Sequence, residues 1–393
     1  MFEKNPRDVV VVAAVRTPVT KSGKGSLKDT RPDDLLIQCI QGLLARVPDF
    51  DPAEIGDCVI GCAFPEGEQG MNVARIATMG AGLPDSVPAM TINRFCSSGL
   101  QALAQAAAVI HAGWMDCALT GGVESMSMIP MGGQKPSPNP TMMEKDPSMY
   151  APMGTTSETV ATRYDVSRED QDAFALRSNQ NALAAQANGT FVDEIVPVKV
   201  RAFVKGAWIE KVVDTDEGPR ASTLEGLAKL RTVFSTTGRS TAGNSSQTSD
   251  GAAASLIMTR EKAQKLGLPV LAVFRGFQVV GVKADEMGVG PAYAIPALLD
   301  HYGMTADDVD VYEINEAFAS QALYSVRKAG IDPERVNPHG GAIALGHPLG
   351  CTGAKLTATL LHELKRSGKH FGVVSMCIGG GMGAAGLFEH ELG

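Results

Sequence analysis

A cysteine at a turn of small residues is the first candidate for chemistry in this sequence. Cys96 comes directly before Ser97, Ser98 and Gly99, and an alanine-rich helical pattern covers residues 98–112. Small residues let the backbone turn sharply there, and the partial positive charge of a helix N-terminus lowers the pKa of a thiol. The position therefore predicts a nucleophilic cysteine. The competing interpretation is a small buried side chain that only packs in the core.

A histidine in a glycine-rich loop is the candidate base. His347 lies in the segment 340–350, which has neither the Lys-Ser/Thr pair of a phosphate loop nor dinucleotide-binding spacing after a strand. A histidine placed where backbone can approach a ligand is suited to general-base catalysis near neutral pH. His339 is a rival for this role. The structural alternative is a loop histidine that only hydrogen-bonds to backbone carbonyls.

A second cysteine precedes a run of glycines. Cys377 ends an apolar segment, and Gly379, Gly380 and Gly381 follow it closely. Backbone N–H groups of such a run can converge on one spot, as an oxyanion hole requires, and a thiol beside that hole is suited to proton transfer. The alternative is a glycine-rich corner that is shaped only for packing.

Two polar residues give less specific signals. Asn315 opens a predicted helix over residues 316–328, where it would either cap the helix or orient a water or a carbonyl group. Ser246 lies in a polar, turn-rich run at 241–247, which is either a ligand contact or a plain loop.

The elements that must position these residues alternate between strands and helices. Apolar runs predict strands at residues 9–15, 57–64, 116–120, 269–274, 309–314 and 371–376, with Gly121 and Gly122 closing the third of them. Helical periodicity and capping signals predict helices that begin near residues 30, 98, 167, 293, 316 and 356. Because β-α-β alternation is typical of parallel sheets, we expect a largely parallel sheet covered by helices on both faces.

The two ends of the chain share an internal repeat. Cys96, a helix and then Gly121-Gly122 in the first part are echoed by Cys351, a helix and then Gly379-Gly380 in the last part. Two halves of similar topology would pack about a pseudo-twofold axis. A site would then form where both halves present helix N-termini.

Composition narrows the possible classes of function. The chain has 393 residues, 44% of them hydrophobic, and a formal net charge of −8. We expect a soluble protein of two or three packed units that does not bind nucleic acid by general electrostatics. The basic stretch 190–240 is either a solvated face or an anion-binding surface. No apolar run is long enough to span a membrane.

Cysteine usage bears on location and on metals. The seven cysteines are an odd number scattered along the chain, which predicts reduced thiols and a cytoplasmic location. Cys58 and Cys62 lack a second pair at zinc-finger spacing, so we expect them in the core and predict no metal site.

Four segments together resemble the signature blocks of the thiolases. They are residues 93–102, 315–319, 340–350 and 377–383, and they occur in the family's order; residues 16–18 and 121–126 are similar to further family segments. The resemblance implies an α/β fold of two βαβαβαββ halves in a five-layer α-β-α-β-α arrangement, with an inserted loop domain. The implied division is 1–122 plus 241–268 for the first half, 123–240 for the loop domain that binds coenzyme A, and 269–393 for the second half.

The resemblance also implies a role for each matching residue. Cys96 would be the nucleophile that accepts the acyl group, His347 its activating base, and Cys377 the acid/base of the carbon–carbon bond step. Asn315 would hold the water of one oxyanion hole, shared with the His347 ring, and the backbone N–H groups of Cys96 and Gly379 would form the other. The positions implied to contact substrate or coenzyme A are Ser246 and Met153 at the pantetheine arm, Phe318, and Arg220 near the nucleotide end. Coenzyme A would be a co-substrate, with no bound cofactor.

Finer features favour one subclass of the family. Short-chain biosynthetic thiolases carry a His where this chain has Pro152, and residues 244–251 look more like the degradative 3-ketoacyl-CoA thiolases of fatty acid β-oxidation. The alternative is an acetoacetyl-CoA thiolase that condenses two acetyl-CoA molecules. Two further alternatives are disfavoured. A ketosynthase would lack the second cysteine, Cys377. An inactive acyl-CoA-binding scaffold would not have suitable residues at all four catalytic positions, which here are Cys96, His347, Cys377 and Asn315.

The resemblance implies a homodimer, with a tetramer as the alternative. Residues 57–64 are expected to form an apolar edge strand that pairs across a twofold axis, and residues 70–75 resemble the family segment that reaches the partner. An unpaired apolar edge would be an aggregation hazard in a monomer.

Overall fold

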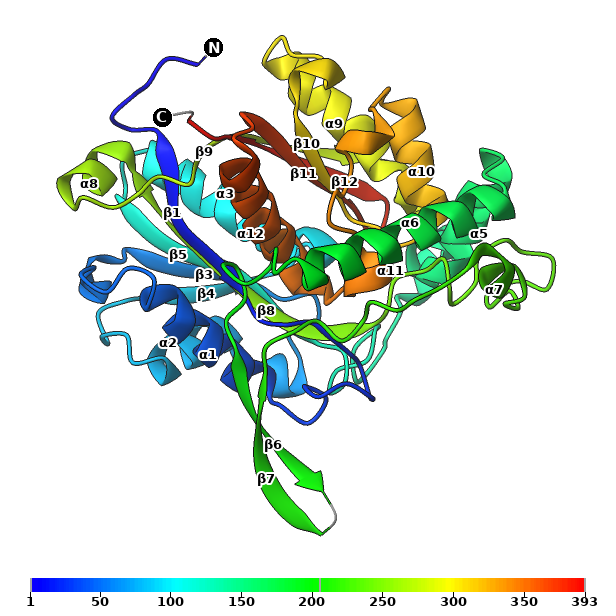
Figure 1. The fold of residues 1–393 in the computed structure, drawn as a ribbon, viewed down its shortest axis with the longest axis horizontal. Coiled ribbons are helices and arrows are strands. Elements are labelled where there is room, and N and C mark those ends of the chain that lie inside the picture. The colour runs from blue at the N-terminus through cyan, green and yellow to red at the C-terminus, as the bar shows by residue number, and fades with distance from the viewer. Residues whose placement is uncertain (1, 205, 392–393) are drawn as a thin grey trace.

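The computed structural model describes residues 2–204 and 206–391, and a large β-sheet runs through it (Figure 1). The first part of the chain forms β1 (Val9–Arg16), β2 (Thr20–Lys21), α1 (Pro32–Leu44), β3 (Asp57–Gly61), α2 (Val73–Gly80), β4 (Ala89–Ile92), α3 (Ser98–His111) and β5 (Cys117–Ser125). The middle part forms α4 (Pro140–Lys145), α5 (Met153–Arg163), α6 (Arg168–Ala187), β6 (Val198–Val204), β7 (Ala207–Val213), α7 (Leu224–Ala228), β8 (Ser249–Thr259) and α8 (Arg260–Lys265). The last part forms β9 (Ala272–Gly281), α9 (Gly290–His301), β10 (Val311–Ile314), α10 (Ala319–Lys328), α11 (Ala342–Leu345), α12 (Leu349–Ser367), β11 (Phe371–Ile378) and β12 (Met382–Glu389).

The main sheet is mixed, with the strand order β10-β11-β12-β9-β1-β8-β5-β3-β4 and the short β2 paired to β8. Among the described strands of this sheet, β3 runs parallel to β4 and β5, and β10 runs parallel to β11. The other pairs are antiparallel. The expectation of a largely parallel sheet is therefore wrong. A tight turn through Gly380 and Gly381, with φ of 79° and 87°, joins β11 to β12 and imposes antiparallel pairing. The segment that connects β5 to β8 is long, so β8 can run in either direction relative to β5, and it pairs antiparallel.

The edge of the sheet differs from the sequence-based expectation. β3 pairs with β4 on one side and with β5 on the other, so residues 57–64 do not supply an edge strand. β4 is the last strand on this side, and its residues are half-buried.

Three hydrophobic clusters divide the molecule into five layers. The first cluster packs α1 and α2 on the outer face of β1, β3, β5 and β8. The second surrounds α3 and α12, whose Leu100 and Leu360 lie between that half of the sheet and the strands β9 to β12. The third packs α9 and α10 on the outer face of β10 to β12. These contacts confirm the predicted α-β-α-β-α order, with α3 and α12 in the centre (Figure 1).

The two halves repeat one topology with one difference. The first follows the predicted βαβαβαββ order from β1 to β8, interrupted by the segment between β5 and β8. In the second, the place of the third strand is taken by a single bridge between Tyr312 and Val336.

The glycine pair predicted to close a strand lies inside that strand. β5 continues through Gly121 and Gly122 to Ser125. A Cβ at Gly121 would come within 2.3 Å of the Ala253 carbonyl oxygen, and one at Gly122 within 2.3 Å of the Gly350 carbonyl oxygen. The two glycines are therefore needed for close packing against β8 and α12, and they do not end the strand.

Several elements carry too little local signal to be predicted, or begin elsewhere than expected. β8 and β12 are rich in Ala and Gly, which have low strand propensity, and the hairpin β6-β7 was also not predicted. α9 begins at Gly290, α10 at Ala319 and α12 at Leu349, so the predicted starts of all three helices are shifted.

The central helices α3 and α12 touch through their backbones. A Cβ at Gly99 would lie 2.6 Å from the Ala354 nitrogen, and one at Gly353 would lie 2.4 Å from the Leu100 nitrogen. Both helices begin at the candidate site, so this contact determines how closely the two halves approach there.

Gly353→Ala is therefore expected to lower the free energy of unfolding by about 1–3 kcal/mol, the usual cost of an overpacked core, despite the better helix propensity of alanine. Urea-induced unfolding followed by circular dichroism measures this change. Gly226→Ala in α7 is the control, because its added Cβ would meet only the Thr223 hydroxyl, at 3.3 Å. If Gly353→Ala is as stable as the parent, the contact is looser than the structure implies.

The segment between β5 and β8 carries its own helices and a projecting hairpin. α6 begins as predicted, with the Ser167 side chain accepting the Asp170 N–H at 3.0 Å, and Gly189 with φ of 70° follows its end. The hairpin β6-β7 projects from the body (Figure 1), and Val198 and Val213 at its base are buried in the first cluster. The division into 1–122 plus 241–268, 123–240 and 269–393 stays a prediction. Within the two described ranges, no helix has both the length and the apolar composition needed to cross a membrane.

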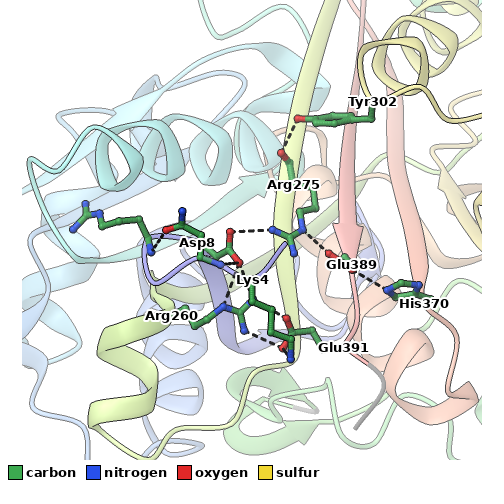
Figure 2. Close-up of polar contacts among 10 residues, drawn as sticks. Lys4, Asp8, Arg260, Arg275, Tyr302, His370, Glu389 and Glu391 are labelled. Carbon is green, nitrogen blue, oxygen red and sulfur yellow. Dashed lines mark hydrogen bonds and ion pairs between the residues drawn. The ribbon is translucent and has the colours of Figure 1, made fainter. Parts of the chain in front are cut away.

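A network of ion pairs holds the two chain ends together (Figure 2). Arg260 donates to Asp8 near the N-terminus and to Glu391 near the C-terminus, at 2.9 and 2.7 Å. Arg275 on β9 bonds Asp8 and Glu389, so charges from four segments meet at the end of the sheet. Both arginine side chains are almost fully buried, and their pairing satisfies charges that would otherwise be costly there.

Candidate active site

Cys96 lies in a tight turn between β4 and α3. The turn is a short 3-10 helix, Phe95–Ser97, and Phe95 adopts the left-handed conformation with φ of 43°. The thiol is buried, and burial raises its pKa to about 12, although the N–H groups of Gly379 and of Cys96 itself act to lower it. The prediction of a lowered thiol pKa is therefore wrong for the resting protein, because desolvation outweighs the backbone dipoles. Cys96 needs a base to become a nucleophile.

His347 is held in one tautomer by its neighbours. Its Nδ1 lies 2.6 Å from the Thr352 hydroxyl, which itself donates to the Pro348 carbonyl at 3.0 Å. The hydroxyl has a single proton, so it accepts from Nδ1–H, and Nε2 carries the lone pair of the ring, which faces Asn315 Nδ2 at 3.3 Å. Burial, with a smaller effect of the Lys355 charge, lowers the His347 pKa to about 3. The ring is thus neutral and has Nε2 available to take a proton.

The rival histidine is occupied elsewhere. His339 lies 2.7 Å from Glu363, beside Arg366, in a polar surface cleft that Asn181 and Asn188 also line. The His347 loop instead reaches Cys96, because Leu349, two residues after His347, packs against it.

Asn315 follows β10 and turns its side chain toward His347. Its Nδ2 lies 3.3 Å from His347 Nε2, and its Oδ1 is buried with no hydrogen-bond partner among the described residues. α10 begins only at Ala319, so the capping role left open by the sequence is wrong. The free Oδ1 suits the other reading, a group that orients a water or a carbonyl.

Cys377 lies near the end of β11 and is fully buried. It packs with Met287, Ala317 and Phe318, and burial, with a further effect of the nearby Cys96, raises the pKa of its thiol. Gly379 follows it and directs its N–H to Cys96. The structure therefore brings Cys96, Cys377 and Gly379 together, and places Asn315 against His347.

Three of the predicted substrate contacts border this cluster. Met153, at the start of α5, packs against the group that contains Cys377 and Phe318. Phe318 forms a bridge with Ser245, and the neighbouring Ser246 donates its N–H to the Ala317 carbonyl at 2.9 Å.

The fourth predicted contact lies farther out. Arg220 is exposed and lines a surface groove of about 580 Å³, formed with Ala221, Ser222, Thr223, Gly226, Leu227, Leu230 and Ala242. Its guanidinium donates to the Ala242 carbonyl at 3.2 Å. Ala242 is only four residues before Ser246, so this stretch of chain connects the groove to the candidate site.

Sequence reasoning did not single out Thr352, which determines the tautomer of His347. The available signal was a hydroxyl residue five positions after the histidine, but the predicted helix began only near residue 356, whereas α12 begins at Leu349 and has Thr352 in its first turn. Hydrogen-bond partners of this kind hold a ring in register without touching the reacting atoms.

Comparisons with known proteins agree with this fold and site. Residues 9–261 match the model of the thiolase N-terminal domain, and residues 268–390 match that of the thiolase C-terminal domain. The chain belongs to the thiolase family. It is 55% identical to the 3-ketoacyl-CoA thiolase of Bacillus subtilis over 389 residues, covering 98% of this chain and 99% of that protein. It is 52% identical to the peroxisomal 3-ketoacyl-CoA thiolase B of Mus musculus over 393 residues, covering 99% and 92%.

Two solved structures have the same fold over nearly the whole chain. The dimeric peroxisomal thiolase of Saccharomyces cerevisiae superposes with a TM-score of 0.91 at 45% identity and covers 99% of both chains. The acetyl-CoA acetyltransferase of Bacillus anthracis gives 0.89 at 40% identity and covers 98% and 99%. The predicted family and fold are confirmed.

Proposed function

We propose that the protein cleaves 3-ketoacyl-CoA with coenzyme A, giving acetyl-CoA and an acyl-CoA shortened by two carbons. The observation that carries this proposal is the proximity of two buried thiols, Cys96 and Cys377, with the N–H of Gly379 directed at Cys96. The relatives of this family member are named 3-ketoacyl-CoA thiolases. One thiol can carry the acyl group while the other moves a proton.

In the first half-reaction, Cys96 attacks the 3-keto carbon while His347 Nε2 takes the thiol proton. The C2–C3 bond then breaks, the electron pair leaves as the enolate of acetyl-CoA, and the Cys377 thiol gives its proton to C2. In the second half-reaction, the Cys377 thiolate takes the proton of incoming coenzyme A, whose sulfur attacks the acyl group on Cys96. Cys96 leaves and recovers its proton from His347.

The two oxyanions of this cycle have separate donors. The N–H groups of Gly379 and Cys96 point at the Cys96 sulfur, which supports the proposal that they stabilise the oxygen of the acyl group formed there. His347 in its protonated form, together with a water on the free Oδ1 of Asn315, would stabilise the enolate oxygen of acetyl-CoA. Because burial opposes isolated charges at these groups, each charge has to form beside a partner or a donor.

The proposal is tested by supplying purified protein with 3-ketooctanoyl-CoA and coenzyme A and separating the products by liquid chromatography. Hexanoyl-CoA and acetyl-CoA in equal amounts are expected. Activity limited to acetoacetyl-CoA would favour the acetoacetyl-CoA thiolase alternative, and no product from any 3-ketoacyl-CoA would favour the inactive scaffold.

Coenzyme A is proposed to bind as a co-substrate along the predicted loop domain. The surface groove fits its nucleotide end, with Arg220 at the phosphates, and the stretch from Ala242 to Ser246 leads the pantetheine arm past Met153 and Phe318 to the thiols. The proposal needs no resident cofactor.

Arg220→Ala is expected to raise KM for coenzyme A about 3- to 10-fold, because an exposed ion contact contributes roughly 1 kcal/mol. kcat at saturating coenzyme A should stay unchanged, since Arg220 does not touch the reacting atoms. Steady-state kinetics with varied coenzyme A measure both values. Lys265→Ala, an exposed cation on α8, is the control. An unchanged KM in Arg220→Ala would place the nucleotide elsewhere.

We propose a homodimer that pairs through the edge strand β4. The neighbouring segment exposes Met71 almost completely and Ile76 in part, which is unfavourable in a monomer. A relative of known structure is described as dimeric.

Light scattering at micromolar concentration is therefore expected to give twice the monomer mass of 41.2 kDa. A replacement of Met90 on β4 by Lys should shift the mass toward the monomer. A parent protein that scatters as a monomer would refute the pairing. A tetramer would favour the alternative of an acetoacetyl-CoA thiolase.

A cytoplasmic location is proposed on the state of the cysteines. All seven are free and buried, which suits a reducing compartment.

A further inference from the structure

A buried carboxylate, Glu124, lies between the turn that holds Cys96 and the loop that holds His347. It is near the end of β5 and fully buried. Its Oε2 accepts the N–H of Ala63 at 2.8 Å and of Gly350 at 2.7 Å, while its Oε1 accepts the Gln69 amide at 2.6 Å and the N–H of Phe64 at 3.3 Å. These bonds satisfy a charge that burial would otherwise make costly.

The contact with Gly350 makes Glu124 the cap of a helix from the other half of the molecule. α12 has Pro348 at its N-cap position, with no capping side chain of its own and no acidic residue in its first turn. A carboxylate at this point satisfies a free N–H and interacts favourably with the helix dipole. α12 follows His347 directly and carries Thr352, which orients the ring. Glu124 therefore anchors the base.

The contact with Ala63 extends to the nucleophile. The Ala63 carbonyl accepts the Asn93 amide at 3.0 Å, and Asn93 Oδ1 accepts the N–H of Phe95, the residue before Cys96, at 2.7 Å. One carboxylate thus holds the Cys96 turn on one side and the His347 helix on the other.

We propose that Glu124 is a positioning residue that holds His347 in register with Cys96 across the two halves of the fold. The proposal rests on the proposed function, in which His347 takes the Cys96 proton. It assigns no contact between Glu124 and substrate.

Glu124→Gln keeps the shape of the side chain but turns one acceptor oxygen into a donor that faces N–H donors. Misplacement of reacting groups by about 1 Å can cost about 100-fold in rate, so we expect kcat to fall by about that factor while KM for coenzyme A changes little. The matched control is Asp310→Asn, which also removes a carboxylate that accepts two backbone N–H groups, those of His370 and Phe371, at the far end of β10. If the loss of kcat relative to the loss of thermal stability is the same in both variants, Glu124 only stabilises the fold and the proposal fails.

A variant that exchanges the carboxylate of Glu124 and the amide of Gln69 tests whether the positions of the hydrogen-bond donors and acceptors matter. In the double variant Gln69→Glu with Glu124→Gln, the new carboxylate at position 69 can accept the Ser125 N–H that Gln69 accepts now, as well as the new amide at 124. The double variant loses only the bond that the Gln69 amide donates to the Phe64 carbonyl at 2.9 Å, so the recovery is expected to be partial. The oxygen at position 124 can then again face Ala63 and Gly350. We expect at least a tenfold recovery of kcat over Glu124→Gln. Recovery of thermal stability without recovery of kcat would overturn the proposal.

A double-mutant cycle makes the test independent of thiolase turnover. The rate at which iodoacetamide alkylates Cys96, read by peptide mass spectrometry, reports how well the thiol is activated. Glu124→Gln and His347→Asn should each slow it, and the double variant should be no slower than His347→Asn alone, because both act through one group. If the two effects multiply, Glu124 does not act through His347. A parent protein without thiolase activity would refute the proposed function and leave this measurement decisive for Glu124.

Discussion

Replacement of Cys96 by alanine is expected to abolish acyl transfer while leaving the protein folded. Loss of the nucleophile from a covalent catalyst lowers kcat by roughly 10⁴- to 10⁶-fold, since the remaining groups have no acyl acceptor to activate. Truncation of one buried thiol should change the free energy of unfolding by no more than about 1 kcal/mol. Coenzyme A release and denaturant unfolding, measured on the same sample, separate the two effects.

The matched control for that experiment is Cys351→Ala. Cys351 occupies the corresponding place at the start of α12 in the internal repeat, and it is buried against Ala253 and Ala354. It has no acceptor role in the proposed cycle, so its loss should leave kcat within a few-fold. A Cys351→Ala variant as inactive as Cys96→Ala would contradict the assignment of the nucleophile to Cys96 and not to Cys351.

Replacement of Cys377 by serine is expected to separate the two kinds of chemistry. A hydroxyl gives up its proton far less readily than a thiol, so carbon–carbon cleavage, which needs an acid/base at this position, should slow by about 10²- to 10⁴-fold. Acylation of Cys96 by an activated aryl thioester should persist, because its leaving thiolate needs no proton. Rapid-quench measurement of the two steps in one variant checks this expectation.

Two further outcomes of that measurement are informative. Equal loss of both steps would contradict the division of labour between the thiols and would indicate that Cys377 only shapes the site. Retention of both would transfer the proton-transfer role to another group. His347 would be the next candidate, because its Nε2 is unprotonated and can take a proton.

The catalytic candidates were accessible from sequence because each is marked by its local surroundings. Cys96, His347 and Cys377 all lie near small residues, which the chain needs for sharp turns and close backbone approach. In the structure Cys96 packs against Leu349 of the His347 segment and lies beside Cys377. The five-layer order was accessible through the family resemblance. What could not be predicted is the direction of strands such as β8, which depends on a long connection.

Residues that act through partners distant in the chain could not be identified from the sequence. Glu124 lies in the segment 121–126 that resembles the family, but nothing local indicates its role, because its partners Ala63 and Gly350 lie 61 and 226 residues away along the chain. The raised pKa of Cys96 was missed for a related reason: the sequence displays the helix N-terminus but not the depth of burial that outweighs it. Both depend on how the two halves pack.

The most direct test of the central claim is to trap the acyl-enzyme. The protein is mixed with 3-ketooctanoyl-CoA in the absence of free coenzyme A, quenched with acid, digested and analysed by mass spectrometry. The proposed mechanism predicts one hexanoyl group per chain, on the peptide that contains Cys96. A hexanoyl group on Cys377 or Cys351 instead, or none on any cysteine while the substrate is consumed, would contradict it.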